Sequence, residues 1–125
     1  MSPYNKKKLN KLRKSLDIID KQLLNIFKKR TEIVKGVIKT KEFKKDIIDN
    51  QLIKIIKKRT EIIKKVLLVK NHKNEIVDKK RINLILKRIK KNSIKNKIDP
   101  KITQRIWKNM IWTYIDFERR NFKKK

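Results

Sequence analysis

Apolar residues recur every three or four positions along the first half of the chain. Starting at Leu9, they occupy positions 9, 12, 16, 19, 23, 26, 33 and 37, and the same spacing returns at 48, 52, 55, 62 and 66. This period is typical of an amphipathic α-helix that buries one face. The pattern therefore predicts an all-α fold.

A long stretch of this pattern is present twice. The segment IIDKQLLNIFKKRTEIVKGVIKTK (18–41) returns as IIDNQLIKIIKKRTEIIKKVLLVK (47–70), 29 residues further along, which we interpret as an internal duplication. Each copy keeps an Asp, an Arg ten residues later and a Lys eleven residues after that, namely Asp20, Arg30 and Lys41, then Asp49, Arg59 and Lys70. Because 29 residues make about eight helical turns, the apolar stripe continues on nearly the same face.

The junction between the copies decides the length of the first helix. Residues 39–46 (KTKEFKKD) contain no Gly or Pro, so helix propensity favours one continuous helix of about 65 residues. The open alternative is a chain that folds back near Gly36, with antiparallel pairing about that position that matches Arg13 with Arg59. A second chain or such a fold-back is needed, because the later helices are too short to cover the whole stripe.

Two further helices follow, and with the first they form a single domain, 1–125. Asp78 is the predicted N-cap of a second helix, DKKRINLILKRIKK, and Asp99-Pro100 starts a third, since Pro suits the first helical position. The third helix is expected to turn Ile102, Ile106, Met110, Ile111, Tyr114 and Phe117 inward, with Trp107 and Trp112 as core and interface residues. The prediction is a three-helix chain with an unusually long, or folded-back, first helix.

The composition limits both the cellular compartment and the classes of ligand that we expect. The chain has no Cys, which excludes disulfides and Cys-based metal sites, and no apolar run near the ~20 residues of a membrane span. We therefore expect a soluble, cytoplasmic protein with no metal and no cofactor. The net charge of +28 suggests nucleic acid or another polyanion as a partner. However, the Lys residues are spread over every segment, which also fits compositional drift.

The Arg residues are the more informative cations, because only eight of the forty basic residues are Arg. A planar guanidinium can grip a carboxylate in two places, which Lys cannot do. The chain has no nucleophile–base pair, Gly-rich phosphate loop or metal-ligand spacing. What remains is a set of cations at helical offsets: Arg30 and Lys41 share a face, Arg59 and Lys70 repeat that relation, and Arg81 follows on the next helix. Such a set suits a small anion with two carboxylates.

The ordered series of residues resembles a known family. The segment LRKSLDIIDKQLLNIFKKRTEIVKGVIKTK is similar to the first helix of the all-helical chorismate mutases, and the later DKKR and DPKITQRIWKNMI continue the likeness. Without one copy of the repeat, 96 residues would remain (125 minus 29), close to the length of that family's single domain. The resemblance implies a homodimeric isomerase of aromatic amino-acid biosynthesis (the shikimate pathway). Its substrate, the dianion chorismate, would be rearranged to prephenate.

The resemblance also implies roles for individual residues. The catalytic residues would be Lys70, Glu118 and Arg59, and the substrate-binding residues would be Arg13, Arg30, Lys41, Asp78, Arg81 and Tyr114. Arg13 would reach a substrate carboxylate from the partner chain. Arg59 (or Arg30) would grip a carboxylate, and Lys70 (or Lys41) would donate to the ether oxygen. The second copy is preferred because it alone leads directly into Asp78 and Arg81, although Glu42 stands at its equivalent of Arg13.

Three positions depart from the family pattern. Ile82 stands where a Glu is usual, Tyr114 where a Ser is common, and Glu118 where many members have a Gln that donates to the ether oxygen. A carboxylate cannot donate that bond but a protonated Glu can, so activity is expected to rise as the pH falls. The alternative left open is a Lys-rich helical protein that binds nucleic acid or another polyanion, or a mutase-like scaffold without activity.

Overall fold

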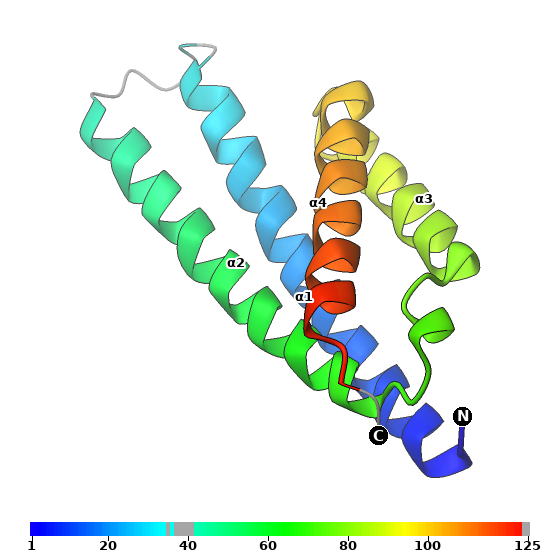
Figure 1. The fold of residues 1–125 in the computed structure, drawn as a ribbon. Helices are drawn as coiled ribbons and strands as arrows, with labels where there is room; N and C mark the ends of the chain where they lie inside the picture. Colours follow the sequence, from blue (N-terminus) through cyan, green and yellow to red (C-terminus); the bar gives the residue numbers. More distant parts are fainter. Residues whose placement is uncertain (35, 37–41, 124–125) are drawn as a thin grey trace.

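Helices make up the fold of the protein. The computed structural model describes residues 1–34, 36 and 42–123. Its elements are α1 (Pro3–Val34), α2 (Glu42–Val69), the short 3₁₀ turn η1 (Lys73–Glu75), α3 (Lys79–Lys95) and α4 (Pro100–Asn121), shown in Figure 1. The described residues contain no strand, which confirms the all-α prediction. In the same part of the chain, no helix is long and apolar enough to cross a membrane.

The two copies of the repeat form an antiparallel helical hairpin, so the expected continuous first helix is wrong (Figure 1). Helix α1 ends at Val34, and the N–H of Gly36 donates to the carbonyl of Ile33 at 3.0 Å. Gly36 has a φ of 71°, a left-handed conformation that Gly reaches readily, so the one Gly of the chain stands where α1 ends. The fold-back alternative is the correct one. It buries the two apolar stripes against each other, whereas a single rod would leave both in water.

Two ion pairs fix the register of the hairpin. Arg59 Nε donates to Asp20 Oδ1 at 3.0 Å, and Arg30 Nε donates to Asp49 Oδ1 at 3.0 Å. The residue numbers of each pair add to 79, so the antiparallel pairing is centred between the copies, near position 39.5, and not at Gly36. The predicted match of Arg13 with Arg59 is therefore wrong by about two helical turns. In each pair, the Arg of one copy contacts the Asp of the other copy, so the two ion pairs are equivalent. The hairpin is therefore nearly symmetric when the two copies are exchanged.

The helix caps of α3 and α4 are those that the sequence predicts. Asp78 accepts a hydrogen bond from the N–H of Arg81 at 3.1 Å, and Asp99 accepts one from the N–H of Lys101 at 2.9 Å, with Pro100 in the first turn of α4. These caps satisfy backbone donors that a helix start leaves free. They fix the residues at which the two later helices begin.

The inner face of α4 differs from the prediction in both directions. Ile102, predicted to face inward, is about half exposed, whereas Thr103, Ile115 and Glu118 are buried although they were not predicted on this face. Trp112 is also about half exposed, so it is not part of the core of this chain. The hydroxyls of Ser93 and Thr103 lie 2.7 Å apart where α3 meets α4, and this buried hydrogen bond turns the Thr103 side of α4 inward. Trp107 is fully buried, as expected of a core residue, and its ring meets Phe27 of α1 edge-on at 5.8 Å.

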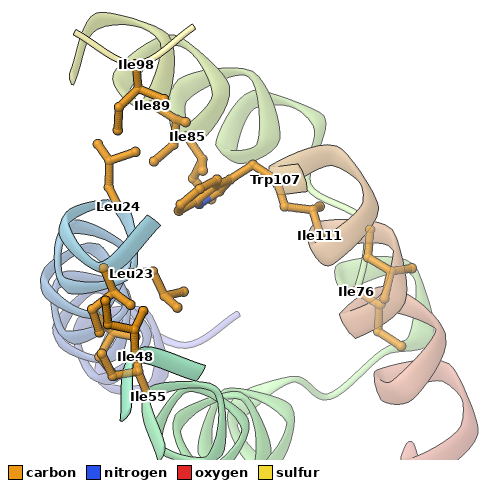
Figure 2. Packing of buried hydrophobic residues seen from close by; sticks show 13 residues of the cluster. Leu23, Leu24, Ile48, Ile55, Ile76, Ile85, Ile89, Ile98, Trp107 and Ile111 are labelled. Carbon is orange, nitrogen blue, oxygen red and sulfur yellow. The ribbon is translucent and has the colours of Figure 1, made fainter. Parts of the chain in front are cut away.

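Helices α3 and α4 cover only one of the two equivalent faces of the hairpin. Leu24 lies on the side of α1 that faces Ile89 and Ile98 (Figure 2), and it is 2% exposed. Its equivalent in the second copy, Ile53, is 65% exposed. Likewise, Phe27 packs on Trp107, while its equivalent, Ile56, is exposed. The near symmetry of the repeat therefore stops at the hairpin, and the rest of the fold is one-sided.

Candidate active site

A cavity of ≈ 80 Å³ lies between the four α-helices, at the end of the hairpin remote from Gly36. Seven of the nine predicted site residues line it: Arg13, Arg59, Lys70, Asp78, Arg81, Tyr114 and Glu118. The rest of its wall is apolar and consists of Leu16, Ile63, Val66, Ile76, Ile82, Ile85, Ile111 and Ile115. The lining therefore combines four cations and two carboxyl groups with an apolar wall of low polarisability, in which electrostatic interactions are stronger than in water.

Arg59 is the most deeply buried cation of this wall, with 3% of its surface exposed. Its Nε is paired with Asp20, and its guanidinium carbon lies 4.7 Å from the centre of the Tyr114 ring. Its Nη1 is buried and has no hydrogen-bond partner. Among the described residues, the other buried side-chain atom of this kind is Trp107 Nε1, which does not line the cavity. Arg59 thus lines the cavity and also keeps one buried donor unused.

Lys70 and Glu118 form a second buried pair. Lys70 Nζ donates to Glu118 Oε2 at 3.2 Å, and both side chains are about 6% exposed. Burial raises the pKa of the Glu118 carboxyl above its ordinary value, although the Lys70 ammonium acts in the opposite direction. Glu118 consequently takes up a proton at a higher pH than an ordinary Glu does. In that neutral form it can donate a hydrogen bond.

Arg13 and Asp78 stand at the partly exposed side of the cavity. Arg13 Nη2 donates to Asp78 Oδ2 at 3.1 Å. Burial alone would raise the pKa of Asp78, but the hydrogen bond from the Arg81 N–H and the charge of Arg13 outweigh it, so that the pKa is lowered. Asp78 is therefore an ionised carboxylate at neutral pH. Arg13, which the resemblance assigned to a partner chain, reaches this site from α1 of the same chain.

Arg81 is turned partly towards α1. Its Nη2 donates to Asp17 Oδ1 at 2.8 Å and to the carbonyl oxygen of Arg13 at 3.3 Å. Asp17 also accepts a hydrogen bond from Arg88 at 2.9 Å. These contacts tie the first turns of α3 to α1 beside the cavity. They hold the Arg81 guanidinium against the segment of α1 that carries Arg13 and Asp17.

Of the first-copy alternatives for the cations, Arg30 lies outside the cavity. Arg30 pairs with Asp49, about two fifths of each side chain is exposed, and neither residue lines the cavity. Lys41 lies outside the described residues. Arg59 and Lys70 line the cavity and Arg30 does not, while the choice of Lys70 over Lys41 stays a prediction.

The departures from the family pattern have visible consequences. Ile82 adds an apolar group to the wall and supplies no hydrogen bond to a ligand. The hydroxyl of Tyr114 lies 2.8 Å from Thr60 Oγ1 and donates to the carbonyl of Ile56 at 3.3 Å. Tyr114 therefore contributes its ring to the site, beneath Arg59, and its hydroxyl is engaged within α2.

Two residues beside the cavity were not predicted to belong to the site. Asp20 pairs with Arg59, and Asp17 pairs with Arg81, and both come from α1. The sequence does carry a signal for Asp20, because an Asp precedes the Arg by ten residues in both copies. That spacing does not reveal that each Asp pairs with the Arg of the other copy, since the pairing depends on the fold-back.

Taken together, the fold and the cavity define an all-helical protein with a buried, cation-rich site. The model of the family chorismate mutase type II matches residues 44–119, which is more than half of the chain, and the protein belongs to that family. This result confirms the resemblance seen in the sequence. Searches of curated proteins and of solved structures give no match. The matched range covers nearly all of α2 to α4 and leaves out α1, the helix that supplies Arg13 and Asp20.

Proposed function

We propose that the protein is a chorismate mutase, an isomerase that rearranges chorismate to prephenate in aromatic amino-acid biosynthesis. The observation that carries this proposal is the partnerless Nη1 of buried Arg59, in a wall that also holds Arg13, Lys70 and Arg81. A buried donor without a partner is unfavourable. A carboxylate of the substrate would supply the partner in a charge-assisted hydrogen bond, which is stronger than a neutral one.

The chemistry of this reaction suits such a site. An intramolecular rearrangement of this kind needs no covalent intermediate and no proton transfer, so the protein must hold the substrate in its compact reactive conformer and stabilise the charge that develops on the ether oxygen. We assign Arg13 and Arg59 to the two carboxylates. Lys70 Nζ would donate to the ether oxygen, and neutral Glu118 would supply a second donor there. Asp78, at the cap of α3, would accept from the substrate's hydroxyl.

Binding of the substrate would exchange ion-pair partners within the cavity. At ≈ 80 Å³ the cavity is smaller than the roughly 300–1,000 Å³ of common ligand sites. The pairs Lys70–Glu118 and Arg13–Asp78 border it. In our proposal the substrate carboxylates and ether oxygen replace these acidic partners, so the space opens as the cations turn to the substrate. Arg13 belongs to the same chain, so a homodimer is not required to complete the site.

The direct test follows the loss of chorismate absorbance with the purified protein and two variants, Arg59→Lys and Lys70→Ala. Removing one such donor lowers kcat/KM by about 10²–10³-fold in comparable sites. The repeat offers a matched control, since Arg30→Lys changes the equivalent Arg outside the cavity, and Lys64→Ala removes an exposed Lys of α2. Both controls should stay within about twofold of wild type, because surface changes are usually mild.

The outcome distinguishes a specific substrate site from non-specific binding of anions by the positive charge of the protein. Arg59→Lys keeps the net charge, so a polyanion-binding protein would lose nothing from it, whereas a site that uses the planar guanidinium would. No turnover by the wild-type protein, or equal losses in the Arg59 and Arg30 variants, would rule out the proposed function.

A further inference from the structure

We infer that Asp20, in the first copy of the repeat, is a positioning residue that fixes the guanidinium of Arg59 for its ligand, an inference that rests on the proposed function. Asp20 is 4% exposed and Arg59 is 3% exposed. Their contact, Asp20 Oδ1 to Arg59 Nε at 3.0 Å, uses the one guanidinium nitrogen that lies along the side chain. This contact leaves the terminal nitrogen Nη1 without a partner.

A second contact, with the Tyr114 ring, further restricts the Arg59 side chain. The Tyr114 ring lies 4.7 Å from the guanidinium carbon of Arg59, a distance at which a cation is attracted to an aromatic face. The ring is itself held, because its hydroxyl bonds to Thr60 and to the carbonyl of Ile56. Arg59 is therefore held at Nε by α1 and against its plane by α4. A long side chain fixed at two points loses less freedom when it binds a carboxylate, which favours binding.

The equivalent pair, Arg30 and Asp49, shows the same ion pair of the hairpin at a position outside the cavity. Arg30 and Asp49 have the same spacing and the same 3.0 Å contact, so an ion pair at this position is part of the hairpin's register. Yet that pair is about two fifths exposed and lies outside the cavity. Of these two pairs, Asp20–Arg59 is the one that is buried, lies against the Tyr114 ring and has a buried Nη1 without a partner. These differences separate a positioning function from a purely structural one.

The test compares Asp20→Asn with Asp49→Asn, an identical change in the two copies of the repeat. We expect Asp20→Asn to lower kcat/KM by about 10–100-fold, since small displacements of a positioning group have effects of this size. Asp49→Asn should stay within about twofold of wild type. If Asp20 acts through Arg59, the loss should disappear when Asp20→Asn is added to Arg59→Lys, because coupled residues are not additive. Wild-type kinetics in Asp20→Asn, or an equal loss in Asp49→Asn or in the Arg59→Lys background, would overturn the inference.

A spectroscopic measurement keeps this inference distinct from the proposed function. In ¹⁵N NMR spectra, the Arg59 Nε–H signal should shift and exchange faster with water in Asp20→Asn, and it should be unchanged in Asp49→Asn. This readout needs no turnover, so it decides the inference even if chorismate is not the substrate. An unchanged Nε–H signal in Asp20→Asn would contradict it. If Asp20→Asn does not fold, Asp20→Glu keeps the carboxylate but displaces it, and it should also shift the Arg59 Nε–H signal and lower kcat/KM; wild-type values for both would contradict the inference.

Discussion

At the scale of single residues, the protonation of Glu118 makes the hydrogen-bonding groups of the cavity depend on pH. Its carboxyl is buried beside the Lys70 ammonium, and its pKa is raised above the ordinary value by burial. Because the raised pKa belongs to an acid, the neutral form is populated below that pKa and is lost as the pH rises through it. The neutral form is the one that can donate to an ether oxygen.

The first prediction concerns this proton. The kcat/KM of the wild-type protein should rise as the pH falls through the raised pKa of Glu118, by about tenfold per unit on the alkaline side, since only the neutral acid donates. Glu118→Gln carries a permanent donor, so its kcat/KM should be flat from pH 5 to pH 8, about the range in which carboxylates of a substrate stay ionised. A pH dependence in Glu118→Gln equal to that of the wild type would assign the titration to another group.

The site's charged residues can be predicted in part, while their partners cannot. The offset between Arg59 and Lys70 places both on one side of the second copy, whereas the resemblance to the family, and not their spacing, assigns Asp78 and Arg81 to the site. Asp20 lies 39 residues before Arg59, and its contact arises only because the chain folds back. The engagement of the Tyr114 hydroxyl with α2 is equally non-local. Contacts of this kind depend on tertiary register, which no local pattern contains.

At the scale of the elements, helix α1 serves both the core and the site. Its apolar stripe packs on α2 and on the α3–α4 pair. Its Arg13 lines the cavity, and its Asp17 and Asp20 pair with Arg81 and Arg59 of the cavity wall. The sequence predicts the helix and its buried face correctly. It does not predict where the helix ends, because helix propensity over residues 39–46 favours continuation. The fold-back is instead favoured by burial of both stripes, a property of the whole hairpin.

The second prediction uses the two copies as each other's control. Leu24→Ala removes a side chain that is 2% exposed and should lower the free energy of unfolding by about 2–5 kcal/mol. The equivalent change, Ile53→Ala, affects a side chain that is 65% exposed and should stay within about 0.5 kcal/mol. Urea unfolding followed by circular dichroism measures both. Equal destabilisation by the two variants would mean that both faces of the hairpin are covered in solution.

At the scale of the whole molecule, the repeat provides two similar helices and the rest of the chain uses them unequally. The α3–α4 pair closes a cavity on the side of the hairpin where Arg13, which precedes the first copy, lies with Arg59 and Lys70 of the second. On the other side, Arg30 and Asp49 pair at the surface, and the residue equivalent to Arg13 is Glu42. The cavity therefore combines, within one chain, residues of α1 that precede the first copy with residues of the second copy.

The central claim is that this single-chain cavity is the site at which chorismate rearranges, and co-expression of Arg13→Ala with Lys70→Ala tests it most directly. In an intertwined dimer with Arg13 supplied by the partner, mixed dimers would restore about a quarter of the wild-type sites, because half of the dimers would be mixed and each would hold one intact site. Our account predicts an active wild-type protein, two variants of low activity, and no recovery in the co-expressed mixture. Recovery towards a quarter of the wild-type rate would contradict a site completed within one chain, and an inactive wild-type protein would contradict the function itself.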